Sequence, residues 1–241
     1  MPGTTVKTEA VVLRSIRYGE ADRILHLYSH DRGRIGAIAK GSRKPKSRFG
    51  GRLEPFFRLD LMLHEGRGDL MTVTGVTTVD GYPRLRSDGA AIGAGARACD
   101  AVLRLLDAAE PNPPAYHLLC RYLELLDTPG DPRATALEVA LSFRLKLALA
   151  AGFVPELASC ARCGEAEHLT GFSGAAGGVV CASCERGSFE LSEEAHRFMA
   201  DSLASPLADA PRAGERALRQ VERAVSETLE YHAHVRLRAA A

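Results

Sequence analysis

The sequence lacks long hydrophobic runs and carries almost no net charge. Its 31 basic and 30 acidic side chains leave a formal charge of +1, which argues against a protein whose whole surface is basic, such as a histone-like nucleic-acid binder. No apolar run approaches the ~20 residues that a membrane-spanning helix requires. The segment Ala10 to Leu13 is too short for the core of a signal peptide. We therefore expect a soluble, unexported protein with no membrane partner.

Motifs of the common catalytic and nucleotide-binding classes are also missing. The chain has no P-loop, no HExxH, no GxSxG and no GxGxxG placed after a strand. Its eight histidines are scattered, and nothing resembles a catalytic constellation. The composition, 46% apolar and 25% charged, excludes a disordered or collagen-like chain. The sequence therefore predicts a globular protein that is not an enzyme and has no small-molecule substrate.

The first 80 residues have the pattern of β-strands. Runs rich in Val, Ile, Thr and Leu are separated by short turns that contain glycine, such as residues 31–33. Apolar and polar residues alternate over 57–63, which is the period of a half-buried strand. The predicted strands cover residues 6–16, 24–29, 35–40, 56–65 and 70–80. Five short strands joined mainly by hairpins indicate a small closed barrel over residues 1–81, either OB-like or SH3-like.

From about residue 85 onward the hydrophobic period changes from two to 3.6, which is typical of helices. Asn112-Pro113 and Asp131-Pro132 each predict a helix start, with an N-cap followed by proline, and Gly152 predicts a helix end. A further helix is predicted after Ser192. The apolar stripes are Ala91, Ala98, Val102, Leu105 and Ala109; Leu119, Tyr122, Leu123 and Leu126; Leu137, Leu141, Leu145 and Leu149; and Leu218, Val221, Val225 and Leu229. The pattern predicts a C-terminal α-helical domain over residues 82–241, and hence an α+β multidomain chain.

Four of the six cysteines form a pattern typical of zinc sites. The two pairs are Cys160-Ala-Arg-Cys163 and Cys181-Ala-Ser-Cys184. They flank 17 residues, a spacing that matches Cys₄ zinc sites. Each two-residue spacer lets a tight turn direct both sulfurs at one ion, and four thiolates complete a tetrahedral shell. The prediction is one structural Zn²⁺ in a module over residues 158–190, inserted within the helical domain.

Two other interpretations of these cysteines are less well supported. A redox pair would be expected within a thioredoxin-like βαβ pattern, which the sequence lacks. A zinc hydrolase or nuclease needs an open metal position and a general base, whereas a four-thiolate shell leaves no position for water. The remaining cysteines, Cys99 and Cys120, fall in helical stripes and are predicted to be buried thiols.

The near-zero net charge hides a local basic excess. Residues 1–80 carry 14 basic and 9 acidic side chains, whereas residues 81–241 carry 17 and 21. Five cations fall between Arg43 and Arg52, and a basic loop on a small barrel is the layout of a phosphate-tracking groove. Within it, Phe49 is the candidate for stacking on a base. The predicted DNA-contacting residues are Lys40, Arg43, Lys44, Lys46, Arg48 and Arg52.

The charge pattern leaves alternatives open. The loop can be solvated without a partner, or it can bind acidic protein tails, which would make the chain a zinc-stabilised interaction scaffold. Helical arginines could also extend a DNA path, and the sequence does not rank them; they are Arg121, Arg197, Arg216, Arg219 and Arg223.

Several blocks of residues together resemble one known family. They are Val12-Leu13-Arg14, residues 18–23 (YGEADR), residues 40–51 (KGSRKPKSRFGG) followed by Leu53-Glu54-Pro55-Phe56, and the cysteine quartet with Phe172 and Gly177-Gly178 between its halves. In this order they are similar to the RecO family of bacterial recombination mediators. The resemblance implies an N-terminal OB domain, a helical domain and a zinc module inserted between helices.

The same resemblance implies a function. Proteins of this family bind single- and double-stranded DNA, anneal complementary strands in the RecF pathway and act with RecR to load RecA onto strands covered by single-strand-binding protein. By resemblance, the partners are therefore DNA, RecR and single-strand-binding protein, and the location is the cytoplasm, in association with the nucleoid.

Overall fold

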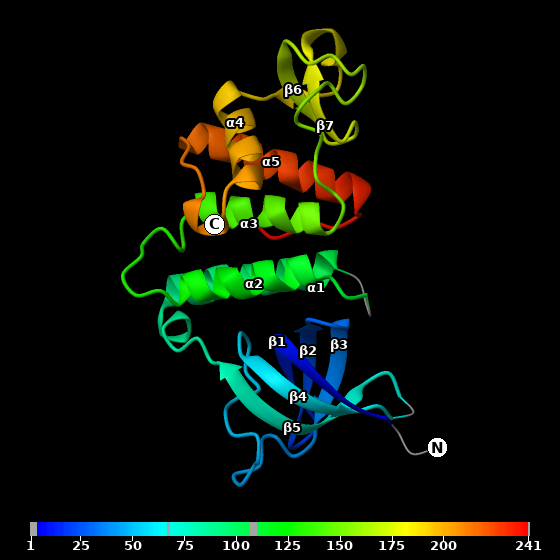
Figure 1. Ribbon diagram of the computed structural model, residues 1–241, viewed down its shortest axis with the longest axis vertical. Helices are drawn as coiled ribbons and strands as arrows, with labels where there is room; N and C mark the ends of the chain where they lie inside the picture. Colours follow the sequence, from blue (N-terminus) through cyan, green and yellow to red (C-terminus); the bar gives the residue numbers. More distant parts are fainter. Residues whose placement is uncertain (1–3, 67, 107–109, 241) are drawn as a thin grey trace. The chain divides into compact units, whose positions relative to one another are not determined.

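The computed structural model describes residues 4–66, 68–106 and 110–240. The chain forms two compact units, Met1–Pro129 and Gly130–Ala241 (Figure 1). The change from strands to helices falls near residue 81, so the first unit contains both the barrel and the first helices. None of the described helices is both long and apolar enough to span a membrane.

The first unit begins with a closed five-stranded barrel. Its strands are β1 (Thr5–Tyr18), β2 (Asp22–Ser29), β3 (Gly33–Ala39), β4 (Arg58–His64) and β5 (Met71–Asp80). They close in the order β1-β2-β3-β5-β4, with β1 paired to β4, and only β3 and β5 run parallel to each other. This Greek-key closure is of the OB type. The predicted barrel is confirmed, and the order of the strands excludes the meander of an SH3-like barrel.

Alternate residues of the strands fill the barrel. The predicted alternation in β4 is confirmed, because Leu59, Leu61 and Leu63 are fully buried whereas Met62 is 49% exposed. The other four strands of the barrel also contribute side chains to the core. These are Ala10, Val12, Leu25, Leu27, Ile35, Ala37, Ala39 and Val73. The outward-facing residues of the strands are thereby left for contacts outside the barrel.

Two helices complete the first unit, α1 (Gly89–Leu105) and α2 (Pro113–Leu126), after the short 3₁₀ helix η1 (Leu85–Ser87). The predicted start of α2 is confirmed, since the Asn112 side chain accepts a hydrogen bond from the Ala115 amide at 3.0 Å. Helix α1 comes close to the barrel at Gly95, where a Cβ atom would lie 3.1 Å from the ring of Phe56. Ala109, expected in the stripe of α1, falls outside the described residues.

A polar network connects the barrel to α2. The carboxylate of Glu9 on β1 accepts a hydrogen bond from the Tyr116 hydroxyl at 2.7 Å and another from Arg58 Nε at 2.7 Å. Arg58 also lies 3.8 Å from Glu124 of α2. Burial acts to raise the pKa of Glu9, but the bonds from Tyr116 and Arg58 outweigh it and hold the pKa below its usual value. Ionised Glu9 therefore stabilises the contact of helix and barrel.

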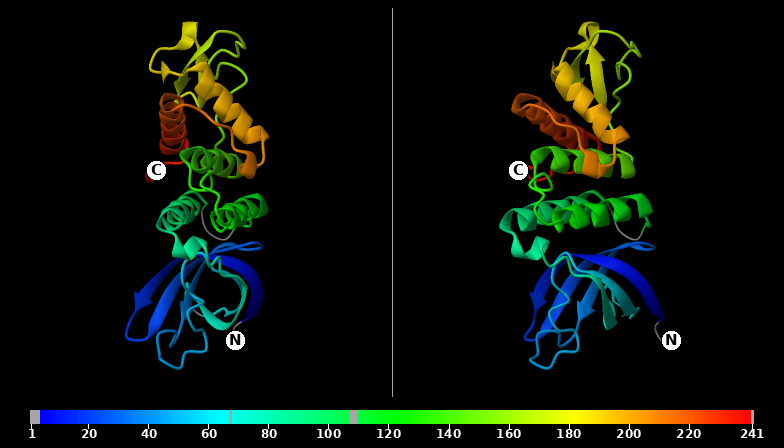
Figure 2. Two further views of the ribbon diagram at one scale, coloured as in Figure 1. Left: turned by 90° about the vertical axis from the view of Figure 1, so that its left-hand side faces the viewer. Right: turned by 60° about the vertical axis from the view of Figure 1, so that its left-hand side comes forward.

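The second unit is built on three helices that pack on one another, α3 (Leu137–Ala150), α4 (Glu193–Ala204) and α5 (Glu215–His232), with the 3₁₀ helix η3 (Leu207–Asp209) before α5 (Figure 2). Helix α4 begins after Ser192, as predicted, and the Ser192 side chain caps it. Gly152 follows the end of α3 with a φ of +82°, and the Phe153 amide returns to the Ala148 carbonyl at 2.8 Å. The stripe predicted for α5 is buried.

A small three-stranded sheet lies in the connection between α3 and α4. It contains β6 (Leu169–Ser173), β7 (Gly178–Cys181) and β8 (Phe189–Glu190) in the order β7-β6-β8. The 3₁₀ helix η2 (Ala182–Cys184) follows β7 directly. The cysteine pairs predicted to form a metal module thus belong to this sheet and its turns.

Two predictions for α3 are wrong. Asp131 does not cap it, because its carboxylate accepts the Arg133 amide at 2.9 Å within a separate turn, and α3 begins at Leu137 without a side-chain cap. Leu149 is 49% exposed although it continues the predicted stripe. Helix α3 is buried on most of its circumference, so its apolar residues do not mark a single face.

The Glu9 network predicts a specific dependence of stability on pH. Since its pKa is lowered in the folded chain, ionised Glu9 adds stability above the pKa of an unfolded glutamate, and this contribution is lost as the pH falls below about 4.3. We expect Glu9→Gln to lower the free energy of unfolding at pH 7 by about 1–2 kcal/mol and to weaken its decline in acid. Urea unfolding across this pH range tests both effects, with the exposed Glu20→Gln as control; a parallel decline in Glu9→Gln and the parent would contradict them.

Candidate nucleic-acid interface and metal centre

The basic loop, residues 40–55, connects β3 to β4 at the end of the barrel away from α1 and α2 (Figures 1 and 2). It contains no regular strand or helix and runs as a series of turns. Phe49 and Leu53 point into the barrel core and are 1% and 2% exposed. Burial of these two side chains fixes the middle of the loop to the barrel.

Hydrogen bonds fix the two ends of the basic loop. The Gly41 amide donates to the Asp22 carboxylate at 2.7 Å, and the Arg43 amide donates to the Ala21 carbonyl at 2.8 Å. Both acceptors belong to the turn and strand that follow β1. The acidic residue of the loop, Glu54, pairs with Arg23 of β2 at 2.6 Å. The loop is therefore attached to the β1–β2 hairpin, and its one carboxylate is already neutralised.

Five cations of the basic loop remain directed at solvent. They are Lys40, Arg43, Lys44, Lys46 and Arg48, and all are exposed. Within the described part of the chain none of the five forms an ion pair with a carboxylate. Arg43 reaches the Gly19 carbonyl at 3.3 Å, and Arg48 lies 4.9 Å above the ring of Phe49. The predicted residues are thus gathered on one loop as unpaired positive charges, which is the electrostatic condition for holding phosphates.

Phe49 and Arg52 differ from the other predicted residues. The ring of Phe49 is buried in the barrel, which contradicts the expectation that it stacks on a base. Arg52 is half-buried and donates to the carbonyls of Phe49 and Arg48, both at 2.9 Å. Its guanidinium closes a turn of the loop, so it holds the loop's shape as well as adding charge.

The five helical arginines considered as an extension of a DNA path are neutralised locally. Each of the five considered as an extension of a DNA path contacts a glutamate: Arg121 with Glu124, Arg197 with Glu193, Arg216 with Glu190, Arg219 with Glu215, and Arg223 with Glu227. Three of these pairs have the i,i+4 spacing that favours ion pairs along a helix. The structure therefore separates the unpaired cations of the basic loop from the paired arginines of the helices, a distinction that sequence composition does not make.

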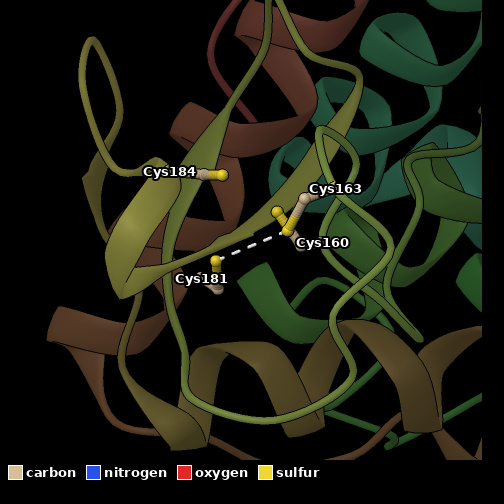
Figure 3. Close-up of side chains that lie close together, drawn as sticks. All are labelled: Cys160, Cys163, Cys181 and Cys184. Carbon is tan, nitrogen blue, oxygen red and sulfur yellow. Dashed lines mark hydrogen bonds between the residues drawn. The ribbon is translucent and has the colours of Figure 1, made fainter.

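The four predicted metal ligands converge. Cys160, Cys163, Cys181 and Cys184 direct their sulfurs toward a common centre (Figure 3), and all four sulfurs lie within 4.8 Å of one another. The sulfurs of Cys163 and Cys181 are 3.7 Å apart. Tetrahedral coordination with metal–sulfur bonds of about 2.3 Å places ligand sulfurs roughly 3.8 Å apart. The quartet can thus hold one metal ion, and it is the one such cluster found among the described residues.

The chemistry of the donor set also suits an ion. Burial acts to raise the pKa of Cys160, but backbone N–H groups of the two knuckles point at its sulfur and lower its pKa, whereas the contact with Cys163 raises the pKa of Cys184, as expected for thiols that crowd one another without an ion between them. Arg162, between the first two ligands, donates to the carbonyls of Cys184 and Arg186, both at 2.8 Å. This residue joins the two knuckles, a role that the CxxC spacing does not reveal. The four thiolates leave no coordination position for water, which is typical of a structural site.

The two remaining cysteines are buried thiols, as predicted. Cys99 is 2% exposed in α1 and Cys120 is 5% exposed in α2. Burial raises the pKa of Cys99 to about 12. These thiols are core residues of the first unit and lie on helices separate from the metal quartet.

The structure thus defines the class of the protein by its parts: an OB-type barrel that carries a loop of unpaired cations, and a cluster of four cysteines that can hold a metal ion. Comparison with protein families gives a more specific result. The family model described as "Recombination protein O N terminal" matches residues 1–82, and the model described as "Recombination protein O C terminal" matches residues 86–240. The chain belongs to the RecO family, as the sequence motifs indicated.

Curated relatives agree with this assignment, and those that follow are each named DNA repair protein RecO. The protein of Rubrobacter xylanophilus is 39% identical over 226 residues, covering 90% of this chain and 89% of the relative. That of Geobacter sulfurreducens is 39% identical over 202 residues, covering 80% and 79%. That of Anaeromyxobacter sp. (strain K) is 39% identical over 185 residues, covering 76% and 71%.

The burial of Phe49 predicts a role in stability. We expect Phe49→Ala to destabilise the barrel by about 3–5 kcal/mol, because it removes a large ring from a packed core. Urea unfolding measures the change, and Val79→Ala, at a position 42% exposed on β5, provides a control with an expected change within about 0.5 kcal/mol. A Phe49→Ala chain as stable as the parent would show that the ring is not part of the core.

The sulfur geometry predicts one bound metal ion for each chain. Elemental analysis of the purified protein tests this number, and acidification should release the ion because protons compete for the thiolates. Cys181→Ser should abolish binding and unfold the sheet of β6 and β7, with loss of hydrogen-exchange protection there, whereas the exposed neighbour Ser183→Ala should do neither. Full protection in a metal-free Cys181→Ser chain would contradict a structural role of the ion.

Proposed function

We propose that this chain is a DNA-binding mediator of recombination and repair, and that the basic loop, residues 40–55, holds the phosphates of single- and double-stranded DNA. The observation that carries the proposal is the set of five exposed loop cations that form no ion pair among the described residues, in contrast to the five helical arginines, each of which is paired with a glutamate. Membership of a family whose relatives are named for DNA repair supports the same conclusion. The assignment comprises Lys40, Arg43, Lys44, Lys46 and Arg48, with Arg52 shaping the loop.

Annealing of complementary strands follows from the electrostatics of this loop. Two strands repel each other as polyanions, and a protein that neutralises phosphates lowers that repulsion without reading the sequence. Contacts restricted to phosphates leave base edges free to pair. The loop cations supply this neutralisation, and the reaction requires no catalytic group.

Partners other than DNA are proposed from the family. They are RecR and single-strand-binding protein, with RecA loading on covered single strands in the RecF pathway as the outcome, in the cytoplasm and near the nucleoid. The charge-balanced helices of the second unit support a division in which DNA engages the barrel and leaves other surfaces for proteins. The corresponding domain assignment is residues 1–81 for DNA binding, 82–241 for the helical domain and 158–190 for the metal module.

The proposed metal of the cysteine quartet is a single Zn²⁺. Four thiolates in a tetrahedral arrangement are the donor set of structural zinc sites, and the closed shell excludes hydrolytic chemistry at the ion. Zinc thus maintains the module and takes no part in contact with DNA.

Charge neutralisation at the loop tests the proposed function. In the quadruple variant Arg43→Ala, Lys44→Ala, Lys46→Ala and Arg48→Ala, we expect weaker binding to single- and double-stranded DNA. The slope of log affinity against log salt on single strands should become shallower by up to about 3, since each lost phosphate contact removes about 0.7. Titration of a labelled oligonucleotide at several salt concentrations measures the slope.

The second unit offers a control of equal charge change. The variant Arg197→Ala, Arg216→Ala, Arg219→Ala and Arg223→Ala removes four cations that are paired with glutamates, and it should alter the slope much less. If both variants weakened DNA binding equally, net charge and not the loop would control binding. If the loop variant kept its DNA affinity but lost binding to an acidic peptide, the loop would be a protein-binding element.

A further inference from the structure

The four cysteines of the metal quartet are not equally open to solvent. Cys160 and Cys181 are buried, at 2% and 4% exposed, and they pack with Val180 in a small apolar cluster. Cys184 is half-buried and packs against the same cluster, whereas Cys163 is exposed. A small reagent in solution therefore meets Cys163 before it meets the other three.

Cys163 also has a second thiol within reach. Its Sγ lies 3.7 Å from the Sγ of Cys181, and the two side chains approach each other from different knuckles (Figure 3). A disulfide bond joins two sulfurs at about 2.05 Å, so these atoms have to approach each other by roughly 1.7 Å to form one. The short distance makes Cys181 a partner for a disulfide with Cys163.

The backbone of the module permits this approach. Cys181 ends β7 and pairs with Leu169 of β6, so the sheet fixes its position. Cys163 lies in a turn, and the next residue, Gly164, has a φ of +79° and open space around it, since no described atom lies within 4 Å of a Cβ built there. The exposed thiol is thus on the part of the module that has room to move, and its partner is on the part that does not.

A bound metal ion supplies the reactive form of the sulfur. The thiolate and not the thiol attacks oxidants, and a cysteine that coordinates a metal is deprotonated. Cys163 is therefore presented to solvent as a thiolate whenever the quartet holds its ion. Thiolate character, exposure and a neighbouring resolving thiol are the features that distinguish cysteines that undergo reversible oxidation.

We propose that Cys163 is a site of reversible oxidation by hydroperoxides such as hydrogen peroxide, that Cys181 is its resolving cysteine, and that formation of their disulfide releases the metal ion. The inference rests on the proposed metal site and goes beyond the proposed contact with DNA. It adds a peroxide-sensitive module to a chain that we assign to DNA repair.

The oxidation takes place in two steps. In the first, the Cys163 thiolate attacks one oxygen of the peroxide, the O–O bond breaks and hydroxide leaves, which gives the sulfenic acid of Cys163. In the second, the Cys181 thiolate attacks the Cys163 sulfur, the S–S bond forms and a second hydroxide leaves. The two thiolates lose two electrons and the peroxide gains them, while two protons from solvent convert the hydroxides to water.

Loss of the ion follows from the loss of two ligands. Cys160 and Cys184 alone do not complete the tetrahedral shell that a structural ion requires, so the ion dissociates with its own charge unchanged. A dithiol reductant reverses the oxidation by thiol–disulfide exchange and restores all four ligands. Unlike a structural role alone, this chemistry makes metal content depend on the redox state of the solution.

Treatment of the purified, metal-loaded protein with hydrogen peroxide tests the proposal. We expect release of one metal ion from each chain, followed with a chromogenic chelator, and loss of two hydrogen atoms from the intact mass. Peptide mapping should find a disulfide between Cys163 and Cys181, with Cys99 and Cys120 still reduced because both are buried. A dithiol reductant and added Zn²⁺ should then restore the original mass and metal content.

A histidine in place of one cysteine retains four ligands and gives a matched pair of variants. Cys163→His removes the exposed thiolate, so we expect it to keep its metal at a peroxide concentration that strips the parent. Cys184→His has the same number of thiolates but retains the pair of Cys163 and Cys181, so peroxide should still form the disulfide and release the metal. Metal content measured before peroxide is added verifies that both shells are filled.

Each other outcome contradicts a specific part of the proposal. Metal retained by the parent in peroxide, metal released without a disulfide, or a disulfide between a different pair would overturn it, and these results come from the parent even if neither variant holds metal. Equal rates of release from Cys163→His and the parent would show that Cys163 is not attacked. A chain that binds no Zn²⁺ at all would overturn the metal site and this proposal together, whereas the proposed function of the basic loop is decided separately by its DNA affinity.

Discussion

The burial of Phe49 is the contact on which the arrangement of the basic loop depends. A loop rich in like charges resists ordering, because its cations repel one another and its backbone loses conformational freedom on being fixed. Insertion of one aromatic ring and of Leu53 into the barrel opposes both effects. The cations on either side of Phe49 are then held at the surface in a fixed arrangement, so less ordering is required when a polyanion binds.

The chain keeps positive charge available by separating it from carboxylates in sequence. Between Lys40 and Pro55 the single acidic residue is Glu54, and Arg23 of a neighbouring strand pairs with it. On α5 the opposite arrangement holds, since Arg219 and Arg223 each find a glutamate four residues away. The net charge of +1 is therefore an average over two different surfaces. The surface of α5 is neutral because its arginines are paired with glutamates, and the surface of the basic loop is positive.

Local patterns predicted those parts of the structure that depend on local contacts. Alternation over β4, the Asn112 cap and the CxxC spacing each follow from interactions within a few residues, and each is confirmed. The position of Phe49 does not follow in this way, because Arg48 and Gly50 beside it give the pattern of an exposed loop and only the closed barrel creates the space for its ring. Leu149 shows the opposite case. It is an apolar residue that continues the stripe of a largely buried helix, but it lies near the end of α3 and is exposed.

The metal module also alters the topology of the second unit. Residues 151–192 join α3 to α4, and coordination of one ion by the four converging cysteines would convert much of this long connection into a small closed ring with its own sheet. The entropic cost of closing a loop rises only with the logarithm of the loop's length, by about 0.6 kcal/mol for each doubling. Closure of the ring therefore changes the entropic cost of joining α3 to α4 only slightly, and the module is coupled to the helices mainly by direct contact with α5, where Gln220 donates to the Glu190 carbonyl at 2.9 Å and Arg223 lies over the ring of Phe189.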